Sequence, residues 1–366
     1  MVRGMKKILF YINTLGHGGA ERVMVNLANA LVKRNWSVVF VTSFPEKREY
    51  VCSCEVKRIN LSDERIAGRI KRNLAYTKQL RKVIKQEKPD IVISFMSQPN
   101  FRALTATLGL KAKNLISIRN DPNISYPDKL SRFLSKRFYK LADGVVFQTE
   151  DAQKWFPESI QKKSRIIMNQ VDDRFFNTVY DGERKNIVAT GRLMPQKNHK
   201  LLIDAFSMIS DKINDDLIIY GDGDLREELE AYIAEKNLVG RVKLPGITDD
   251  VIGAIKDARL YVLSSDYEGM PNALIEAMAL GLPCVSTDCP CGGPRVLLDG
   301  LNDNYLVEVG NAKQLADAMC SVLTLSDIDY TAYRSKISAR AQMCRGDKVI
   351  TEWESYINEI CMEKEK

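Results

Sequence analysis

The sequence predicts an α/β protein in which two Rossmann-like domains are each built on a parallel sheet. Short apolar runs of strand length alternate with helix-length stretches, an order that is typical of parallel sheets. The alternation breaks near residues 169–185 and then starts again. With 366 residues, of which 45% are hydrophobic, the chain is long enough for each domain to bury its own core.

The first half of the chain contributes five expected strands. In order, their sequences are KILFYI, SVVFVTS, DIVISF, NLISI and GVVFQT. Amphipathic stretches such as residues 20–34 and 70–87 lie between them and are expected to be helices. We therefore assign residues 1–170 to an N-terminal domain.

The second half repeats this pattern with the runs NIVAT, LIIYG, RVKLPG, LYVLSS and PCVST. These runs define a C-terminal domain over residues 185–346, and the polar segment 171–184 is the expected linker. Three helical stretches close the chain, and the last, from about Asp347 to Cys361, has no strand after it.

Composition excludes several classes of protein. The apolar runs are shorter than the roughly 20 residues that a membrane span needs. The run ILFYI, which follows the basic N-terminus, is too short for a signal peptide. Eight cysteines in a chain of this length do not make a disulfide framework, and two histidines disfavour a zinc site. We therefore expect a cytoplasmic protein with reduced cysteines.

A glycine-rich turn follows the first expected strand, in NTLGHGGAERV (residues 13–23). Gly18 and Gly19, together with Gly16, would let a phosphate approach the amides at the start of the next helix. The alternative is an ordinary tight turn between a strand and a helix. The spacing differs from the dinucleotide pattern G-x-G-x-x-G, which disfavours a nicotinamide cofactor.

Two cations follow the first strand of the second half, in TGRLMPQKNHKLLIDAF (residues 190–206). Arg192 and Lys197 lie on the loop before an amphipathic helix, at the carboxyl end of a strand, where ligands of open α/β sheets collect. A guanidinium and an ammonium group suit a diphosphate. A solvated pair of loop charges is the alternative.

The stretch YEGMPNALIEAMALGLP (residues 267–283) places Glu268 in a loop and Glu276 inside the helix that follows. The first amides of this helix should be directed at an anion; they belong to Asn272, Ala273 and Leu274. Because carboxylates repel a phosphate, we expect the two glutamates to accept hydrogen bonds from sugar and ribose hydroxyls. An acidic residue early in a helix also complements the helix dipole without any ligand.

The sequence GDGDLREELE, which begins at residue 221, contains a D-x-D motif, a pattern of two carboxylates that can hold a manganese ion. Here it follows a strand and opens a helix, so we expect Asp224 to be an N-cap and predict no metal site. Backbone beside a bound nucleotide and its base is expected at Gly221, Gly223, Gly246 and Ile247.

Together these motifs resemble the retaining glycosyltransferases of family 4, which have the GT-B fold. EGMPNALIE is similar to the family's pair of glutamates separated by seven residues, and GRLMPQKNHKLLIDAF is similar to its diphosphate loop. The segments GHGGAE and STDCPCGGPRVLLDG also match, in the family's order and over nearly the whole chain. The resemblance implies two domains that face each other across a cleft, with the active site in this cleft. It also implies that a C-terminal helix (residues 347–366) crosses back to the N-terminal domain.

The resemblance further implies roles for the charged residues. Glu276 would bind the ribose, Glu268 would contact sugar hydroxyls near the anomeric carbon, and the amides of residues 272–274 would hold the distal phosphate. Arg192 and Lys197 would stabilise the negative charge on the leaving diphosphate, so that no metal or other cofactor is expected.

The implied reaction moves a hexose or N-acetylhexosamine from a nucleotide-sugar, UDP-linked by expectation, to a glycolipid or undecaprenyl-linked acceptor. Bacterial enzymes of this kind build capsule, exopolysaccharide or other lipid-linked glycans. Retention is ascribed to front-face attack, with double displacement as the debated alternative. Two other functions stay open at this point, a non-catalytic nucleotide-sugar sensor and an NAD(P)-dependent oxidoreductase.

The chain departs from the family pattern in the sequence SIRNDPN (residues 117–123), where many members carry a histidine near the donor sugar. Arg119, Asn120 and Asp121 stand at this strand end instead. We take Arg119 as a catalytic candidate that acts on the donor sugar or on an acceptor phosphate. His17, in the glycine-rich turn, is not assumed to replace the missing histidine.

Charge is distributed unevenly along the chain. Residues 1–175 carry 33 lysines and arginines against 16 acidic residues, a formal charge of +17, whereas the remainder is acidic. Residues 65–86 and 128–140 combine this charge with apolar residues at helical spacing. We expect them to bind the anionic inner face of the cell membrane; the alternative is that each apolar stripe simply packs on the sheet. Without a recognised nucleic-acid module, nucleic acid is a less favoured partner.

Overall fold

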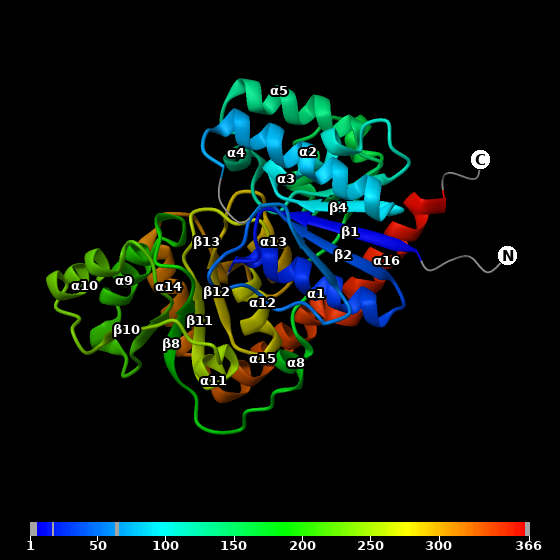
Figure 1. The fold of residues 1–366 in the computed structure, drawn as a ribbon. Coiled ribbons are helices and arrows are strands. Elements are labelled where there is room, and N and C mark those ends of the chain that lie inside the picture. Colours follow the sequence, from blue (N-terminus) through cyan, green and yellow to red (C-terminus); the bar gives the residue numbers. More distant parts are fainter. Residues whose placement is uncertain (1–5, 17, 63–65, 363–366) are drawn as a thin grey trace. The chain divides into compact units, whose positions relative to one another are not determined.

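The computed structural model describes residues 6–16, 18–62 and 66–362 of the chain. These form two compact units (Figure 1). The first unit comprises the residues up to Gln170 together with those from Asp347 onward, and the second unit is Val171–Gly346. The segment 171–184, expected as a linker, falls within the second unit, where Asp173–Asn177 form helix α8.

The first unit is built on a seven-stranded sheet in the order β3-β2-β1-β4-β5-β6-β7. All neighbouring strands pair in parallel. The strands are β1 (Lys7–Ile12), β2 (Ser37–Thr42), β3 (Lys57–Asn60), β4 (Ile91–Phe95), β5 (Lys113–Ser117), β6 (Gly144–Phe147) and β7 (Ser164–Ile166). The helices are α1 (Gly19–Lys33), α2 (Arg69–Glu87), α3 (Ser97–Thr107), α4 (Pro122–Ser125), α5 (Lys129–Phe138), α6 (Glu150–Lys154), α7 (Glu158–Gln161) and α16 (Gly346–Met362).

The second unit contains a six-stranded parallel sheet in the order β10-β9-β8-β11-β12-β13. Its strands are β8 (Lys185–Thr190), β9 (Leu217–Tyr220), β10 (Val242–Gly246), β11 (Ala258–Leu263), β12 (Cys284–Thr287) and β13 (Leu306–Val307). Besides α8, its helices are α9 (His199–Ser207), α10 (Arg226–Glu235), α11 (Val251–Ile255), α12 (Asn272–Ala279), α13 (Gly293–Leu298), α14 (Ala312–Leu323) and α15 (Asp327–Ala341).

Both sheets confirm the predicted α/β class with two Rossmann-like halves. The strands that the apolar runs predicted are all present, and all of them except the edge strand β10 lie inside their sheets, where their residues are mostly buried. Such continuous apolar runs arise because helices cover both faces of a parallel sheet.

The C-terminal helix α16 packs on the first unit, although it follows the second unit in sequence (Figure 1). Trp353, Tyr356 and Ile357 enter the core that contains β1 and α1, and Trp353 stacks on Phe95 with ring centroids 5.6 Å apart. The Glu354 carboxylate accepts a hydrogen bond of 2.8 Å from the indole of Trp36. The expectation that the last helix returns to the N-terminal half is therefore confirmed.

Candidate active site

The predicted donor-side residues of the second unit follow β8 and β11, which are neighbours in the middle of the sheet. β9 lies on the other side of β8, so the direction of strand succession reverses between β8 and β11. Ligands of open α/β sheets bind at the carboxyl ends of strands at such a switch point. The loops after these two strands are therefore the first place to look for a site.

An ion pair joins the two loops. Lys197 Nζ lies 2.6 Å from Glu268 Oε1, and the Ser265 hydroxyl donates a hydrogen bond of 2.8 Å to the same oxygen. The two charged side chains are only 16% and 10% exposed. Within the described residues, the second oxygen of Glu268, Oε2, has no hydrogen bond, so it can accept one from a ligand hydroxyl.

Backbone and side-chain bonds hold the same two loops in register. The Asp266 amide donates to the Gln196 carbonyl at 2.9 Å, and the Asn198 side chain donates to the Asp266 carboxylate at 2.7 Å. Ser264 also donates to the carbonyl of Lys197. The cation and the anion are thus fixed before any ligand arrives, and such preorganisation favours electrostatic catalysis.

Arg192 is not part of this cluster. Its side chain is exposed, and within the described ranges it makes no hydrogen bond or ion pair. Of the two cations predicted for the diphosphate, the structure therefore brings only Lys197 to Glu268. The guanidinium of Arg192 keeps its full donor capacity for a ligand.

Glu276 lies inside α12 and is 5% exposed. Burial, aided by the nearby charge of Glu276, raises the pKa of Tyr261. The Tyr261 hydroxyl is hydrogen-bonded to Thr190 at 3.0 Å, at the carboxyl end of β8. Glu276 therefore lies near the same sheet edge as the ion pair, on a different element.

The predicted anion-binding amides form the first turn of α12. Asn272 and Ala273 are half-buried and Leu274 is buried; Pro271 occupies the N-cap position, without a side-chain cap. The N-terminal amides of a helix have no partner within the helix itself. This is the geometry that binds a phosphate in many proteins.

The loop after β9 packs closely against the backbone that follows β8, and its glycines make this approach possible. A Cβ atom at Gly221 would overlap the carbonyl of Gly191, and one at Gly223 would overlap that of Leu193. The Gly221 amide also donates to the carbonyl of Gly246 at 2.9 Å. Close backbone packing is thus the reason for glycine at both positions.

Ile247 follows Gly246 at the end of β10 and is 69% exposed. Its side chain offers an apolar contact at the sheet edge where a nucleotide base was predicted.

The expected N-cap role of Asp224 is wrong. Helix α10 begins at Arg226 with Leu225 as its N-cap, because Asp224 lies in the turn before it. The neighbouring Asp222 carboxylate pairs with Arg226 at 2.7 Å. In the part of the chain that the structure describes, no group of three His, Cys, Asp or Glu side chains could hold a metal ion.

In the first unit, Arg119 stands just beyond the carboxyl end of β5. Its guanidinium donates to Asn169 Oδ1 and lies 4.5 Å from the centre of the Phe95 ring. Burial lowers the pKa of Arg119 to about 9, and no carboxylate among the described residues pairs with it. A partly buried cation without a counter-ion is a candidate anion site.

The turn that carries Gly18 and Gly19 is less open than the sequence suggests. Gly18 is the N-cap of α1, and a Cβ atom there would overlap the carboxylate of Glu21. A phosphate at these amides would have to displace this carboxylate. His17 lies outside the described residues.

Sequence reasoning missed several polar residues near the carboxyl ends of the strands in the two sheets. Ser265 donates a hydrogen bond to Glu268. Its place just after the predicted strand β11 could have identified it as a site residue. Gln148 follows β6, is 2% exposed, and leaves its Oε1 unpaired within the described residues while its amide group donates to Asn169. Arg102, 4% exposed on α3, donates to Asn13 and Asn73, and nothing in its sequence context announces burial.

Comparison with known proteins places these observations in context. The profile described as Glycosyltransferase Family 4 matches residues 17–175, and that described as Glycosyl transferases group 1 matches residues 184–325. An uncharacterized glycosyltransferase of Methanocaldococcus jannaschii is 32% identical over 63% of this chain and 63% of its own.

A second relative, from Campylobacter jejuni, is 30% identical and covers 97% of this chain and 99% of its own. Its name is GalNAc-alpha-(1->4)-GalNAc-alpha-(1->3)-diNAcBac-PP-undecaprenol alpha-1,4-N-acetyl-D-galactosaminyltransferase. Among solved structures, Anabaena HepE in complex with UDP and glucose superposes with a TM-score of 0.80 at 17% identity, over 97% of this chain and 100% of that one. This likeness shows a shared fold.

Proposed function

The chain belongs to glycosyltransferase family 4, and we propose that it transfers a hexose or N-acetylhexosamine from a UDP-linked sugar to a lipid-linked or polysaccharide-precursor acceptor, with retention. The observation that carries this proposal is the buried cluster of Lys197, Glu268 and Ser265 at the switch point of the second sheet. The name of the Campylobacter relative supports a lipid-linked acceptor, and UDP in the Anabaena structure supports the donor.

The donor would occupy the second unit. Its diphosphate would lie between Lys197, Arg192 and the first amides of α12, and its ribose would bind Glu276. The free Oε2 of Glu268 would accept a hydrogen bond from a sugar hydroxyl, which aligns the anomeric carbon. Gly246 and Ile247 would contact the base.

Bond cleavage would then follow from charge. When the bond between the anomeric carbon and the diphosphate breaks, the leaving oxygen gains negative charge, which Lys197 and Arg192 would stabilise. Two cations and helix amides supply what a metal ion supplies in other transferases, so we propose a reaction without a metal. The acceptor hydroxyl would give its proton to the leaving phosphate as the new glycosidic bond forms.

The first unit would bind the acceptor. Arg119, a cation without a carboxylate partner in the described residues, suits an acceptor phosphate or a hydroxyl of the transferred sugar. Asn169, bound to both Arg119 and Gln148, would hold that guanidinium in place.

Product release from a panel of UDP- and GDP-sugars, with undecaprenyl-diphosphate glycans as acceptors, tests this function. We expect UDP release that depends on the acceptor, a lipid-linked product one sugar longer, and no loss of activity with EDTA. Binding of UDP-sugars without turnover on any acceptor would instead indicate a sensor. Binding of NAD(P) without UDP binding would contradict the proposal altogether.

We also propose that the first unit binds an anionic membrane surface through α5 and the start of α2. Leu130 and Phe133 on α5 are 66% and 65% exposed, and Ile70 and Leu74 on α2 are exposed as well. These apolar side chains do not pack on the sheet, which favours the membrane alternative. Within the described ranges, none of the helices has the length and apolar character to cross a bilayer.

Co-sedimentation with phosphatidylglycerol vesicles tests the membrane proposal. We expect binding at low salt that weakens with added salt and falls in Leu130→Ser/Phe133→Ser. The matched control is Val179→Ser/Ile328→Ser, which removes two apolar side chains of the second unit that are even more exposed, at 87% and 82%. Equal binding of both variants, or binding to neutral vesicles, would contradict the proposal.

Charge reversal needs positions without a structural role. Arg132 donates to the carbonyl of Tyr126, and Lys136 lies 4.2 Å from the centre of the Trp155 ring, so neither is a clean probe. Lys129, Arg137 and Lys140 are exposed. Replacing these three by glutamate should abolish vesicle binding.

A further inference from the structure

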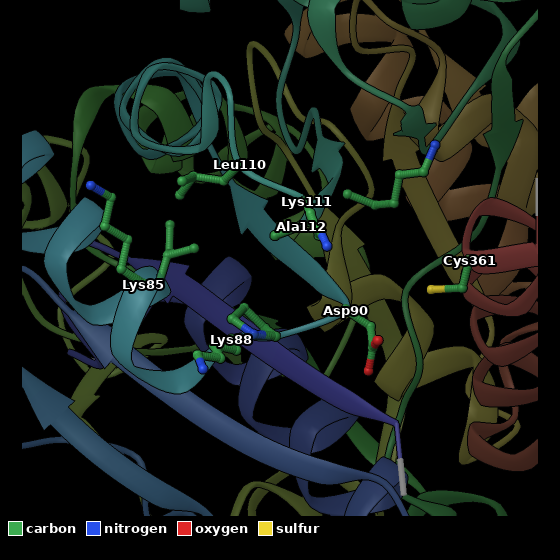
Figure 2. Close-up of a pocket in the computed structure, with 10 residues that line it drawn as sticks. Lys85, Lys88, Asp90, Leu110, Lys111, Ala112 and Cys361 are labelled. Carbon is green, nitrogen blue, oxygen red and sulfur yellow. The ribbon is translucent and has the colours of Figure 1, made fainter. Parts of the chain in front are cut away.

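We propose that the first unit carries a second ligand site, a pocket that binds a phosphate group attached to an apolar body. The pocket has a volume of about 450 Å3 and lies beside the amino ends of β4 and β5 (Figure 2). The candidate residue Arg119 follows the carboxyl end of β5, whereas this pocket lies at the amino ends of the strands of the same sheet. Its volume falls within the range of small-molecule sites.

The pocket is lined by segments that are far apart in the sequence. The end of α2, the loop between α3 and β5, and α16 all contribute, and Figure 2 shows Cys361 reaching from α16 toward the pocket. The lining residues are Ile84, Lys85, Lys88, Pro89, Asp90, Leu110, Lys111, Ala112, Lys113 and Cys361.

Positive charge dominates this lining. Asp90 is the one acidic residue among four lysines, and its carboxylate already accepts a hydrogen bond of 2.8 Å from the Lys7 amide. Lys113 pairs with Asp143 at 2.8 Å. For Lys85 and Lys88, no ion pair or hydrogen bond of the ammonium group exists within the described residues. An anion would therefore neutralise charge that the chain itself leaves uncompensated.

Helix electrostatics account for only part of this arrangement. Lysines in the last turn of a helix complement its dipole, which explains Lys85 and Lys88. Lys111 and Lys113 come from a different segment and gain nothing from that dipole. Lys88 moreover has a left-handed backbone, with φ of 49°, at a C-cap position where glycine is the usual residue.

The floor of the pocket is apolar. Ile84 and Pro89 are buried, and Leu110 and Ala112 are half-buried against the core beneath β1 and β2. A small hydrated anion would gain nothing from these carbons, whereas a hydrocarbon or ring attached to a phosphate would cover them. The shared chemistry is thus a phosphate monoester or diphosphate of an apolar group, whether from a lipid or from a soluble metabolite.

Alkylation of Cys361 in the full-length protein provides a local readout. N-ethylmaleimide labelling is followed by peptide mass spectrometry, with the exposed Cys54 as the internal reference. Soluble dihexanoylphosphatidic acid should slow labelling of Cys361 but not of Cys54. Inorganic pyrophosphate and dihexanoylphosphatidylcholine should each need about tenfold higher concentrations for the same protection. Pyrophosphate lacks the apolar body, and the phosphate of phosphatidylcholine is a diester rather than a monoester. No protection by the phosphatidic acid, or equal protection by either of the other two probes, would overturn the proposal.

Two matched double variants of α2 distinguish an effect of the pocket lysines from a general effect of the protein's charge. Lys85→Glu/Lys88→Glu should abolish protection, whereas Lys78→Glu/Lys82→Glu makes the same charge change at exposed positions of α2 outside the pocket and should retain it. Lys88→Gly tests whether a loss of protection is due to misfolding. Because glycine suits the left-handed C-cap, this variant should keep the fold and still weaken protection of Cys361. Equal loss in both double variants, or full protection in Lys88→Gly, would contradict a site here.

Vesicles distinguish the two sources of ligand. Protection of Cys361 by vesicles that contain phosphatidic acid identifies a membrane lipid, and protection by the soluble form alone identifies a metabolite. Neither result depends on glycosyl transfer, so failure of this proposal leaves the proposed function untouched.

Discussion

The ion pair of Lys197 and Glu268 affects both the stability of the fold and the proposed catalysis. An exposed ion pair contributes little to stability, about 0–1 kcal/mol. This pair is largely buried, and the loss of one partner would leave a charge without compensation, which costs about 3–5 kcal/mol. An alanine at either position adds a loss of packing to this electrostatic cost, so an isosteric change, which alters the charge and keeps the packing, is the sharper probe.

Glu268→Gln removes the charge and keeps the size and the hydrogen bond to Ser265. We expect turnover to fall more than about tenfold, a loss of about 1.4 kcal/mol of transition-state stabilisation, while UDP affinity is unchanged or higher because a carboxylate near the diphosphate is gone. Steady-state kinetics and calorimetric titration with UDP measure the two effects. Arg192→Ala and Lys197→Ala should slow turnover by a similar factor. A fully active Glu268→Gln would rule out the proposed role of this carboxylate.

Glu276→Gln is the matched comparison on the neighbouring element. If its carboxylate binds the ribose, UDP affinity should fall more than turnover does, the reverse of the Glu268 result. The same titration and kinetics apply. Identical profiles for the two variants would show that the roles are not divided as proposed.

His199 should make stability depend on pH. Burial and, to a smaller extent, the charge of Lys197 lower its pKa to about 4, below the ordinary value of 6.5, against the opposing effect of the Arg192 backbone. The unfolded chain therefore binds the proton more readily than the folded chain between pH 6.5 and 4, so stability falls as pH decreases through this window. The shift corresponds to at most about 3 kcal/mol.

His199→Leu should remove this part of the pH dependence. Urea denaturation of both proteins at pH 7 and pH 4.5 gives the difference, in which the shared titration of carboxylates cancels. We expect the variant to lose less stability on acidification than the parent. An equal loss of stability in the two proteins would mean that His199 has the same pKa in the folded chain as in the unfolded chain.

At the scale of elements, α13 holds the loop that carries Glu268. A Cβ atom at Gly293, the first residue of α13, would overlap the carbonyl oxygen of Gly269 and come within 3.2 Å of Pro271. Gly293→Ala should displace this loop and lower turnover about tenfold or more. Gly300→Ala is the control, since Gly300 has a positive φ but no neighbour within 4 Å. It should reduce stability by about 1 kcal/mol without affecting turnover. Equal kinetics for the two variants would contradict the dependence of Glu268 on α13.

At the scale of the whole molecule, the central strands and one edge strand, β10, were predictable, whereas the other three edge strands were not. Strands β3, β7 and β13 stand at the sheet edges, and they are short, with sequences KRIN, SRI and LV. An edge strand is covered on fewer sides, so it lacks the continuous apolar run that marks a central strand. The two-sheet architecture survives these omissions because its core comes from the central strands.

The candidate site was predictable to the extent that its residues follow central strands within recognisable motifs. Lys197 and Glu268 are sequence-distant, yet the parallel order of β8 and β11 brings their loops together. The contact itself, and the support from Ser265, depend on loop conformations that no periodicity encodes. Arg102 illustrates the same limit, because a helical arginine is ordinarily exposed and its burial follows only from tertiary packing.

The return of α16 to the first unit predicts where its loss would be felt. Trp353 is 1% exposed and packs in the core of that unit, so Trp353→Ala should destabilise the unit by about 3–5 kcal/mol. Hydrogen exchange by mass spectrometry should show faster exchange in β1 and β4, which share this core, with β8 and β11 of the second unit unchanged. Glu352→Ala, at the exposed neighbouring position, should leave both sets of strands protected. Faster exchange in β8 and β11 to the same degree as in β1 and β4 would show that the two units unfold together, and that α16 stabilises the chain as a whole rather than the unit on which it packs.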